Sequence, residues 1–330
     1  MYRLPIFLAT VLFVSSVSAT RYGLSEDIVG SKFLDAFTFQ TIADPTHGRV
    51  NYVNQTQALQ SGIARVTTDS FVMGADSKTT LDPAGPGRDS VRIISKKTYQ
   101  EVVLVIGLRH MPEGCATWPA IRTKQAAAPN TGIVDILEGV NNQPFDQVTL
   151  HTSGGTEIFF YARTSQSDIF SGCTVPANRS ESGTAISNDC DAGCSVGLYN
   201  SSSFGPEFNK VGGGWYVMQR TSTHVSVWLW HRENPFVPLD VRFALPHVDT
   251  SKWGKPAAFF PNDTCDMAGF LTDHNILINL TLCGDWAGNA ATYASSGCPS
   301  TCIDHVNTDP KSFAGAFFDF EALRVYLPEE

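Results

Sequence analysis

The chain has 330 residues, a formal net charge of −9 and an aromatic content of 11%. The acidic balance argues against a nucleic-acid partner, because binding to phosphates needs a basic surface. The length would allow two domains, but no repeat, low-complexity tract or Pro/Ser-rich linker marks a boundary, so we expect one domain.

The first 19 residues have the pattern of a secretory signal peptide. Arg3 precedes an apolar stretch from Leu4 to Val14, and the small residues at 17–19 resemble a cleavage site. The apolar stretch is too short to span a bilayer, and no later stretch approaches the required length. The last residues lack the tail of a lipid anchor. We therefore predict an extracellular or cell-wall protein with no membrane partner, whose single domain covers residues 20–330 and is monomeric.

Short strand-like runs, separated by Gly, Pro, Asn, Asp and Ser, fill the rest of the chain. No long helical period is present, and one short helix is expected within residues 298–307, before the last strand. Many short strands with turn signals indicate an all-β fold, an antiparallel sandwich or jelly roll. The expected strands lie in residues 90–99, 101–111, 133–140, 147–152, 212–222, 224–232, 275–286 and 323–327.

Residues 224–230 show the clearest alternation. Val225, Val227 and Leu229 share one face of the expected strand, while Ser226, Trp228 and Trp230 share the other. The aromatic side chains indicate either packing on both faces of the sheet or a cleft in which sugar rings stack. Considered without other information, this segment favours packing.

Eight cysteines are expected to form up to four disulfides, because their number is even and an exported protein meets an oxidising compartment. Their pairing stays open, since eight cysteines allow 105 combinations. Zinc binding at the Cys298–Cys302 spacing is the competing interpretation, which export disfavours. The cysteines are Cys115, Cys173, Cys190, Cys194, Cys265, Cys283, Cys298 and Cys302.

Five Asn-x-Ser/Thr sequons are candidate glycosylation sites. Asn54, Asn178, Asn200 and Asn262 lie among turn-forming residues and are expected to carry glycans. Asn279 lies inside an expected strand, so its sequon is expected to stay unused.

The chain resembles the secreted fungal laminarinases of glycoside hydrolase family 16. These are endo-β-1,3(4)-glucanases built on a concanavalin-like β-jelly roll, in which two curved antiparallel sheets form a glycan cleft. The resemblance implies β-1,3-glucan or mixed-linkage glucan as partner. Family members can bind a structural calcium ion, but no ligands for it can be assigned in this sequence, and no other cofactor or metal is expected. The segments that carry it are VGSKFLDAFTFQTIADPTHGRVNYV (29–53), GPGRDSVRIISKKTY (85–99), RHMPEGCATWPA (109–120), DILEGVNNQ (135–143), TLHTSGG (149–155), FGPEFNKVGGGWYVMQRT (204–221), AFFPNDTCD (258–266), INLTLCGDWAG (278–288) and SGCPSTC (296–302).

The family's catalytic motif, Glu-x-Asp-x-x-Glu, falls on residues 133–138. Side chains at i and i+2 share one face of a strand, and a bulge is expected to return the residue at i+5 to that face. The resemblance implies that Glu138 is the acid/base and that Asp135 is the acid between the two catalytic positions. Ile133 occupies the position of the nucleophile. Isoleucine has no lone pair and cannot form a glycosyl ester, so retaining hydrolysis is expected to be absent or severely reduced.

The expected substrate-binding surface is altered as well. Arg122 and Ala128 stand where the family has tryptophans, and residues 121–132 are about one residue shorter than the family pattern. Trp118, Trp286 and His151 keep their family matches and are the expected substrate-binding residues. For the two tryptophans, a place in the cleft and a place in the core are equally compatible with the sequence.

Three functions compete. A working glucanase would need a replacement acid, and Asp135 or Glu113 are the candidates; Asp135 is expected to lie too near Glu138 for an inverting reaction. A second possibility is a protein that binds β-glucan or a cell-wall glycan without cutting it. The third is a scaffolding or glycan-remodelling role with no preserved cleft.

Overall fold

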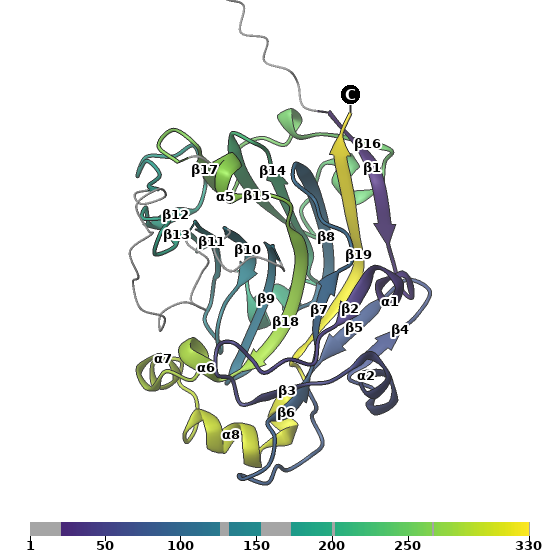
Figure 1. The fold of residues 1–330 in the computed structure, drawn as a ribbon, viewed down its shortest axis with the longest axis vertical. Helices are drawn as coiled ribbons and strands as arrows, with labels where there is room; N and C mark the ends of the chain where they lie inside the picture. The colour runs from purple at the N-terminus through teal and green to yellow at the C-terminus, as the bar shows by residue number, and fades with distance from the viewer. Residues whose placement is uncertain (1–20, 126–131, 153–172, 200–201, 266, 330) are drawn as a thin grey trace, which may run out of the picture.

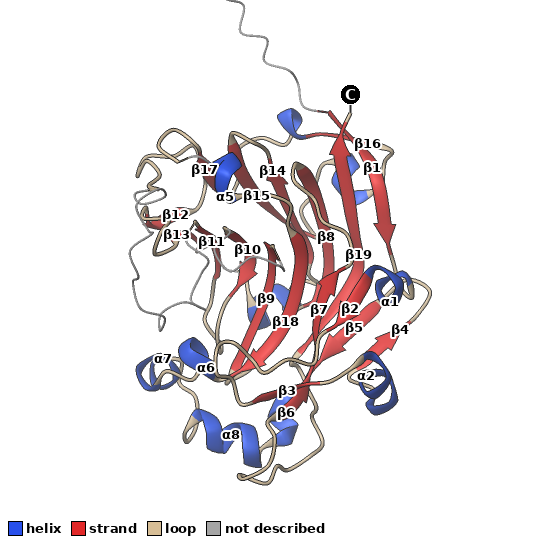
Figure 2. Ribbon diagram, viewed as in Figure 1, coloured by secondary structure: helices blue, strands red, loops and turns tan. Residues whose placement is uncertain are grey.

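The computed structural model describes residues 21–125, 132–152, 173–199, 202–265 and 267–329. In these ranges two large antiparallel sheets face each other, and short helices lie at the edges of the sandwich (Figures 1 and 2). This arrangement confirms the predicted all-β jelly roll.

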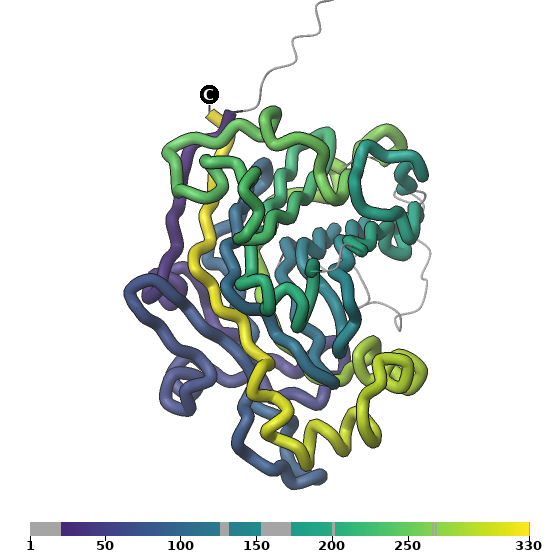
Figure 3. The backbone as a smooth tube through the Cα atoms, turned by 180° about the vertical axis from the view of Figure 1, so that it is seen from behind, coloured from purple at the N-terminus to yellow at the C-terminus, as the bar shows by residue number. Residues whose placement is uncertain are grey.

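The first sheet has the strand order β16-β1-β19-β8-β14-β15-β17, with β5 paired to β19 and β4 paired to β5. Strands from opposite ends of the described chain, β1 and β19, lie side by side (Figure 3). The bounds are β1 (Arg21–Ile28), β4 (Ala64–Val66), β5 (Phe71–Gly74), β8 (Val102–His110), β14 (Gly214–Arg220), β15 (His224–His231), β16 (His247–Asp249), β17 (Ala258–Pro261) and β19 (Phe317–Pro328).

The second sheet has the order β12-β13-β11-β10-β9-β18-β7-β2 and contains the acidic strand at its centre. Its strands are β2 (Phe37–Phe39), β7 (Arg92–Ser95), β9 (Thr117–Lys124), β10 (Ile133–Glu138), β11 (Asp146–His151), β12 (Thr184–Ser187), β13 (Cys194–Leu198) and β18 (Asn275–Leu282). A separate parallel pair joins β3 (Val50–Tyr52) to β6 (Arg88–Ser90).

The described helices are all short, which fits the absence of a helical period in the sequence. They are α1 (Lys32–Ala36), α2 (Gln55–Ser61), α3 (Gly205–Lys210), α4 (Leu239–Arg242), α5 (Met267–Phe270), α6 (Gly284–Ala287), α7 (Ala290–Ser295), α8 (Cys302–Thr308) and the 3₁₀ turns η2 (Thr250–Lys252) and η3 (Pro310–Phe313). Helix α8 confirms the one predicted helix.

The predicted strand over residues 275–286 is wrong at its end. Strand β18 stops at Leu282, because Cys283 and Gly284 have φ angles of 61° and 68° in the left-handed region and redirect the chain. Trp286 consequently lies on the short helix α6 and not on a strand.

The main core lies between the two sheets, where residues such as Leu104 of β8 and Val134 of β10 meet. Trp228 and Trp230 belong to a second cluster on the opposite face of the first sheet. Both rings make edge-on contacts with Trp253, at centroid distances of 5.3 Å and 5.9 Å. Packing on both faces is thus confirmed for β15, and the alternative of a sugar cleft on this strand is wrong.

All eight cysteines form disulfides, and these pair Cys115 with Cys298, Cys173 with Cys265, Cys190 with Cys194, and Cys283 with Cys302. The zinc interpretation of Cys298 and Cys302 is therefore wrong.

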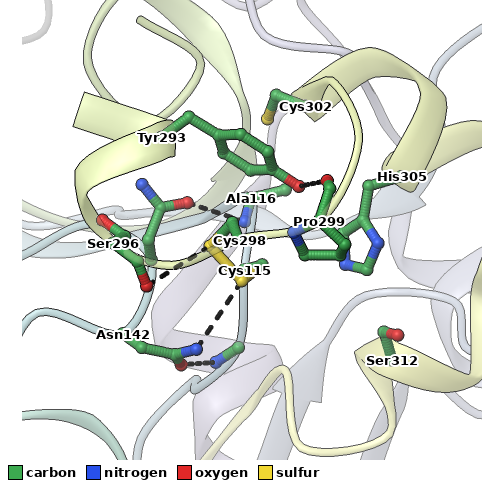
Figure 4. The surroundings of a disulfide bond; sticks show 12 residues. Cys115, Ala116, Asn142, Tyr293, Ser296, Cys298, Pro299, Cys302, His305 and Ser312 are labelled. Carbon is green, nitrogen blue, oxygen red and sulfur yellow. Dashed lines mark hydrogen bonds between the residues drawn. A yellow bond between two sulfur atoms is a disulfide. The ribbon is translucent and has the colours of Figure 1, made fainter. Parts of the chain in front are cut away.

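The Cys115–Cys298 bond joins the loop before β9 to the segment between α7 and α8 (Figure 4). In the same loop the Ala116 backbone N–H donates to Asn141 Oδ1 at 2.7 Å. These contacts fix the start of β9 against the end of β10.

The sequons differ in exposure. Asn54, Asn178 and Asn262 are exposed, and Asn54 also caps α2 by accepting the Gln57 backbone N–H. Asn279 is only 4% exposed within β18, which leaves no room for a glycan on this side chain. Asn200 and the predicted signal peptide lie outside the described residues.

Candidate active site

A bulge in β10 brings its two acids to one face of the second sheet. The pairing of β10 with β9 shifts between Asp135 and Leu137, as the motif spacing predicted. Ile136 and Leu137 both pack in the core between the sheets, so the chain regains its alternation one residue later. Asp135 and Glu138 therefore both face away from that core, on what we call the cleft face.

Ile133 lies on the same cleft face, two residues before Asp135. It is opposite His151 of β11 and Lys124 of β9, and it is 4% exposed. Next to Asp135 on this face, the first position of the six-residue motif therefore carries a branched hydrocarbon side chain and no carboxyl group.

Arg122 lies between the two remaining acids. It is opposite Asp135 in the pairing of β9 with β10, so its side chain also projects from the cleft face. Its Nε is 3.0 Å from Asp135 Oδ1, and its Nη2 donates to Glu138 Oε1 at 2.8 Å. A single guanidinium group bridges both carboxylates, a role that was missed when the sequence suggested only a lost tryptophan.

Asp135 is held in its ionised form. Burial acts to raise its pKa, but the charge of Arg122 and the hydrogen bond from His151 outweigh that effect and leave the pKa lowered. The His151 Nε2 atom lies 3.4 Å from Asp135 Oδ2. His151 is therefore at the site, where it contacts the middle acid of the motif.

Glu138 titrates close to neutral pH. Burial, and then the negative charge of Asp135, raise its pKa to about 7. Its Oε1 atom also accepts a hydrogen bond from Trp118 Nε1 at 3.0 Å. A carboxyl group that can hold or release a proton near pH 7, beside one that stays ionised, is the electrostatic arrangement that acid/base chemistry uses.

Asp146 of β11 holds the backbone of Glu138, a contact that the sequence did not indicate. Its Oδ1 atom accepts the backbone N–H of Glu138 at 2.8 Å, and its own backbone N–H donates to Ser203 Oγ at 3.0 Å. Burial raises the pKa of Asp146 well above its usual value. Asp146 is the first residue of β11 and lies just before the strand expected over residues 147–152, so no local pattern indicated the contact.

The two predicted tryptophans occupy different environments. Trp118 is on β9 and 6% exposed, packed with Val140 and Ala287, so most of its ring is buried although it reaches Glu138. Trp286 of α6 is half-buried and meets Trp118 edge-on at a centroid distance of 5.6 Å. Of the two, Trp286 has more ring surface free for a ligand.

Glu113, considered as a replacement acid, has other partners. Its Oε2 atom accepts a hydrogen bond from Asn209 of α3 at 2.8 Å, and its side chain lies against Gly315. Ala128 falls outside the described residues.

In the described ranges, no group of three or more His, Cys, Asp and Glu side chains is arranged to hold a metal ion. None of the helices there has the length and hydropathy needed to cross a membrane.

A jelly roll with an acidic, bulged strand on one sheet face is the architecture of a class of glycoside hydrolases. The family model described as XgeA-like, catalytic GH16 domain matches residues 37–326, and the chain therefore belongs to glycoside hydrolase family 16. Among solved structures it is similar to laminarinase 16A of Phanerochaete chrysosporium, which holds β-glucans in donor and acceptor sites. That similarity has 45% identity and a TM-score of 0.86, and it covers 93% of this chain and 99% of the other.

Curated relatives are similar over nearly the whole chain. A probable glycosidase of Schizosaccharomyces pombe is 36% identical over 311 residues, which are 94% of this chain and 70% of that protein. A probable endo-1,3(4)-beta-glucanase of Neosartorya fischeri is 38% identical over 320 residues, 92% of this chain. The chain spans only 45% of the length of this second relative.

Proposed function

We propose that the protein is a β-1,3(4)-glucan-directed member of family 16 whose hydrolytic activity is lost or severely reduced, and which acts by binding glucan. The glucan assignment rests on the family and on its relatives, one of which was solved with β-glucans bound. The loss of hydrolysis rests on the site itself.

The observation that carries the proposal is the position of Ile133 on the cleft face beside Asp135 and Glu138. Retaining glycosidases form a covalent bond between a carboxylate and the sugar, which a hydrocarbon side chain cannot make. Removing a negative charge next to the developing oxocarbenium ion also weakens transition-state stabilisation. The same reasoning disfavours glycan remodelling by transfer, because transfer through a glycosyl ester needs the same nucleophile.

Arg122 makes rescue by the remaining acids unfavourable. An inverting reaction needs two carboxyls roughly 6.5–9.5 Å apart, with a water between the sugar and the base. Here one guanidinium group contacts both Asp135 and Glu138. Its charge and volume occupy the space between the acids, and its hydrogen bond engages the Glu138 oxygen that would donate a proton.

Restoring the acid tests the loss of hydrolysis. Ile133→Glu alone and together with Arg122→Trp should be compared with the unchanged protein and with Ile133→Gln, which matches the glutamate in size but is a poor nucleophile. Reducing-end release from laminarin is the measurement, with circular dichroism to verify folding. We expect no release from the unchanged protein or Ile133→Gln, and release from at least the double variant. Release by the unchanged protein, or a covalent sugar adduct in its mass spectrum, would refute the loss of activity.

Retention on insoluble β-1,3-glucan tests the binding function. We expect the unchanged protein to be retained and Trp286→Ala to be retained less, because Trp286 is half-buried and packs on Trp118, which donates to Glu138. Phe236→Ala is the matched control, since Phe236 is an 85% exposed aromatic residue on a loop of the first sheet. If neither the unchanged protein nor the control is retained, the glucan-binding function is wrong.

The remaining expectations are proposals of the same kind. Four disulfides and glucanase relatives support an extracellular or cell-wall location. Removal of residues 1–19, a single domain over residues 20–330 and a monomeric state are parts of this proposal. Mass spectrometry of the secreted protein would test the removal of residues 1–19, and sedimentation would test the monomeric state.

A further inference from the structure

The cleft face continues beyond the acidic strand, toward the β12 edge of the second sheet. Asp135 of β10 is opposite Thr149 of β11, which is opposite Ser195 of β13. The next row on this face places Gln147 of β11 opposite Gly197 of β13. Thr149 and Ser195 are buried, whereas Gln147 is partly exposed and donates to Thr149 Oγ1 at 3.4 Å, so the accessible polar group on this path is the amide of Gln147.

An aromatic ring lies flat on this face at the end of β13. A Cβ atom added to Gly197 would be only 2.6 Å from Cε2 and 2.9 Å from Cζ of Tyr199. The tyrosine ring therefore folds back over the bare backbone of Gly197, and this position of the ring requires glycine there. Tyr199 remains 54% exposed, so the ring face that turns away from Gly197 is available to a ligand.

Two more apolar side chains extend this surface. The ring of Phe145 has its centroid 4.2 Å from that of Tyr199. Ile186 of β12 is 47% exposed, and its Cδ1 atom would be 3.1 Å from the same added Cβ on Gly197. We call Phe145, Ile186 and Tyr199 the tyrosine platform. Core residues of the same strand, Val196 and Leu198, face the other way.

The platform does not resemble the scattered apolar residues that any protein surface contains. Tyr199 and Ile186 meet over Gly197, Phe145 packs against Tyr199, and the partly exposed amide of Gln147 lies on the same face, in the row of Gly197. An exposed flat ring next to hydroxyl and amide groups matches a sugar, whose ring has an apolar face and a polar edge.

We propose that the tyrosine platform is a sugar-binding subsite, on which one ring of a β-glucan chain stacks while the chain runs across β11 toward Glu138. This inference rests on the proposed glucan-binding function. Neighbouring strands are about 4.8 Å apart, so Gly197 lies roughly 10 Å from β10. Only an oligosaccharide that extends past the sugar at Glu138 reaches the platform. The contribution of the platform to binding affinity therefore depends on the length of the oligosaccharide.

Calorimetric titration of laminaribiose and laminariheptaose tests this length dependence. For Tyr199→Ala we expect the Kd of laminariheptaose to rise about tenfold, since one stacking face is lost, and that of laminaribiose to stay unchanged. Tyr199→Phe keeps the ring and should bind laminariheptaose as the unchanged protein does. Gly197→Ala keeps every platform side chain but lifts the tyrosine ring, and it should weaken laminariheptaose binding.

Phe236→Ala, which removes an exposed ring far from the cleft face, is the control for nonspecific effects. If the unchanged protein binds laminariheptaose and both Tyr199→Ala and Gly197→Ala bind it equally well, the platform is overturned and the glucan-binding function stands. If the unchanged protein binds neither sugar, both proposals fall. Sedimentation that shows a dimer dissolved by Tyr199→Ala would identify the platform as a protein contact and also overturn its assignment to sugar.

Discussion

At the scale of single residues, Ile133 and Arg122 determine the chemistry of the candidate site. Ile133 places hydrocarbon on the cleft face beside Asp135 and Glu138, and Arg122 places one positive charge between these two acids. An isolated pair of buried carboxylates is unfavourable, because each charge is desolvated and repels the other. The guanidinium group offsets part of that repulsion, so Arg122 stabilises the pair formed by Asp135 and Glu138.

Glu138 gives the first prediction at this scale. Its pKa is raised from 4.5 to about 7 by burial and by Asp135, so between these values the folded protein binds a proton that the unfolded chain has released. Stability is therefore expected to fall as pH rises from about 4.5 to about 7, by on the order of 3 kcal/mol. Glu138→Gln removes this titration and should make the fall in stability over that interval less steep.

Urea unfolding at about pH 5 and about pH 7.5 measures both profiles. Asp135 does not disturb this comparison. Its pKa is lowered in the folded protein, so its contribution to the free energy of unfolding is complete above the usual carboxyl pKa and is lost only at more acidic pH. Equal pH dependence of the unchanged protein and Glu138→Gln would show that Glu138 titrates normally.

At the scale of elements, the candidate site depends on how β10 is tied to β11. The pairing of β10 with β11 ends at Asp135, and beyond it the Asp146 side chain of β11 accepts the backbone N–H of Glu138. Burial raises the pKa of Asp146 well above its usual value, so the site favours the neutral carboxyl group, whose oxygen accepts the Glu138 N–H.

Two substitutions at Asp146 separate charge from hydrogen bonding. Asp146→Asn keeps a neutral oxygen acceptor and should change the free energy of unfolding by less than about 0.5 kcal/mol. Asp146→Ala leaves the Glu138 N–H without its acceptor and should cost about 1–3 kcal/mol. Denaturant unfolding of both variants at neutral pH is the measurement. A large loss in Asp146→Asn would mean that the carboxyl is ionised and that its charge matters.

At the scale of the whole molecule, disulfides link segments that are far apart in the chain. Cys115 and Cys298 are separated by 183 residues, whereas Cys190 and Cys194 are separated by only 4. A cross-link restricts the unfolded chain more when it closes a longer loop. The long link is therefore expected to contribute more to global stability than the short one.

Paired alanine substitutions test this expectation. Replacing Cys115 and Cys298 should lower the free energy of unfolding by roughly 3 kcal/mol more than replacing Cys190 and Cys194, on the loop-entropy estimate. Thermal and denaturant unfolding of the two double variants give the comparison. A greater loss from the short link would indicate that local structure around Gly193, not chain entropy, dominates.

The sequence predicted what depends on local patterns and left out what depends on partners across strands. Alternation and turn residues predicted the all-β fold, and the motif spacing predicted the bulge that returns Glu138 to the face of Asp135. The bridge made by Arg122 arises from its register against Asp135, which no spacing within either strand reveals. The same holds for the hydrogen bond of Asp146 and for the disulfide pairing, which needed three-dimensional proximity.

Trp118 and Trp286 illustrate the limit at a single position. The sequence left both residues open between core and cleft, because a tryptophan suits either environment. Burial of Trp118 follows from Val140 and Ala287, which pack around it, and the partial exposure of Trp286 follows from the turn at Cys283 that ends β18.

The extra residue in β10 also limits how this chain tolerates change in length. Deleting one residue between Asp135 and Glu138 would restore unbroken alternation and rotate the carboxyl of Glu138 inward, among Val134 and its hydrophobic neighbours. Inserting one would have a similar effect. Side-chain substitutions along the cleft keep the direction of Glu138, whereas an insertion or deletion in β10 reverses it. In related sequences we therefore expect insertions and deletions to be absent from this strand.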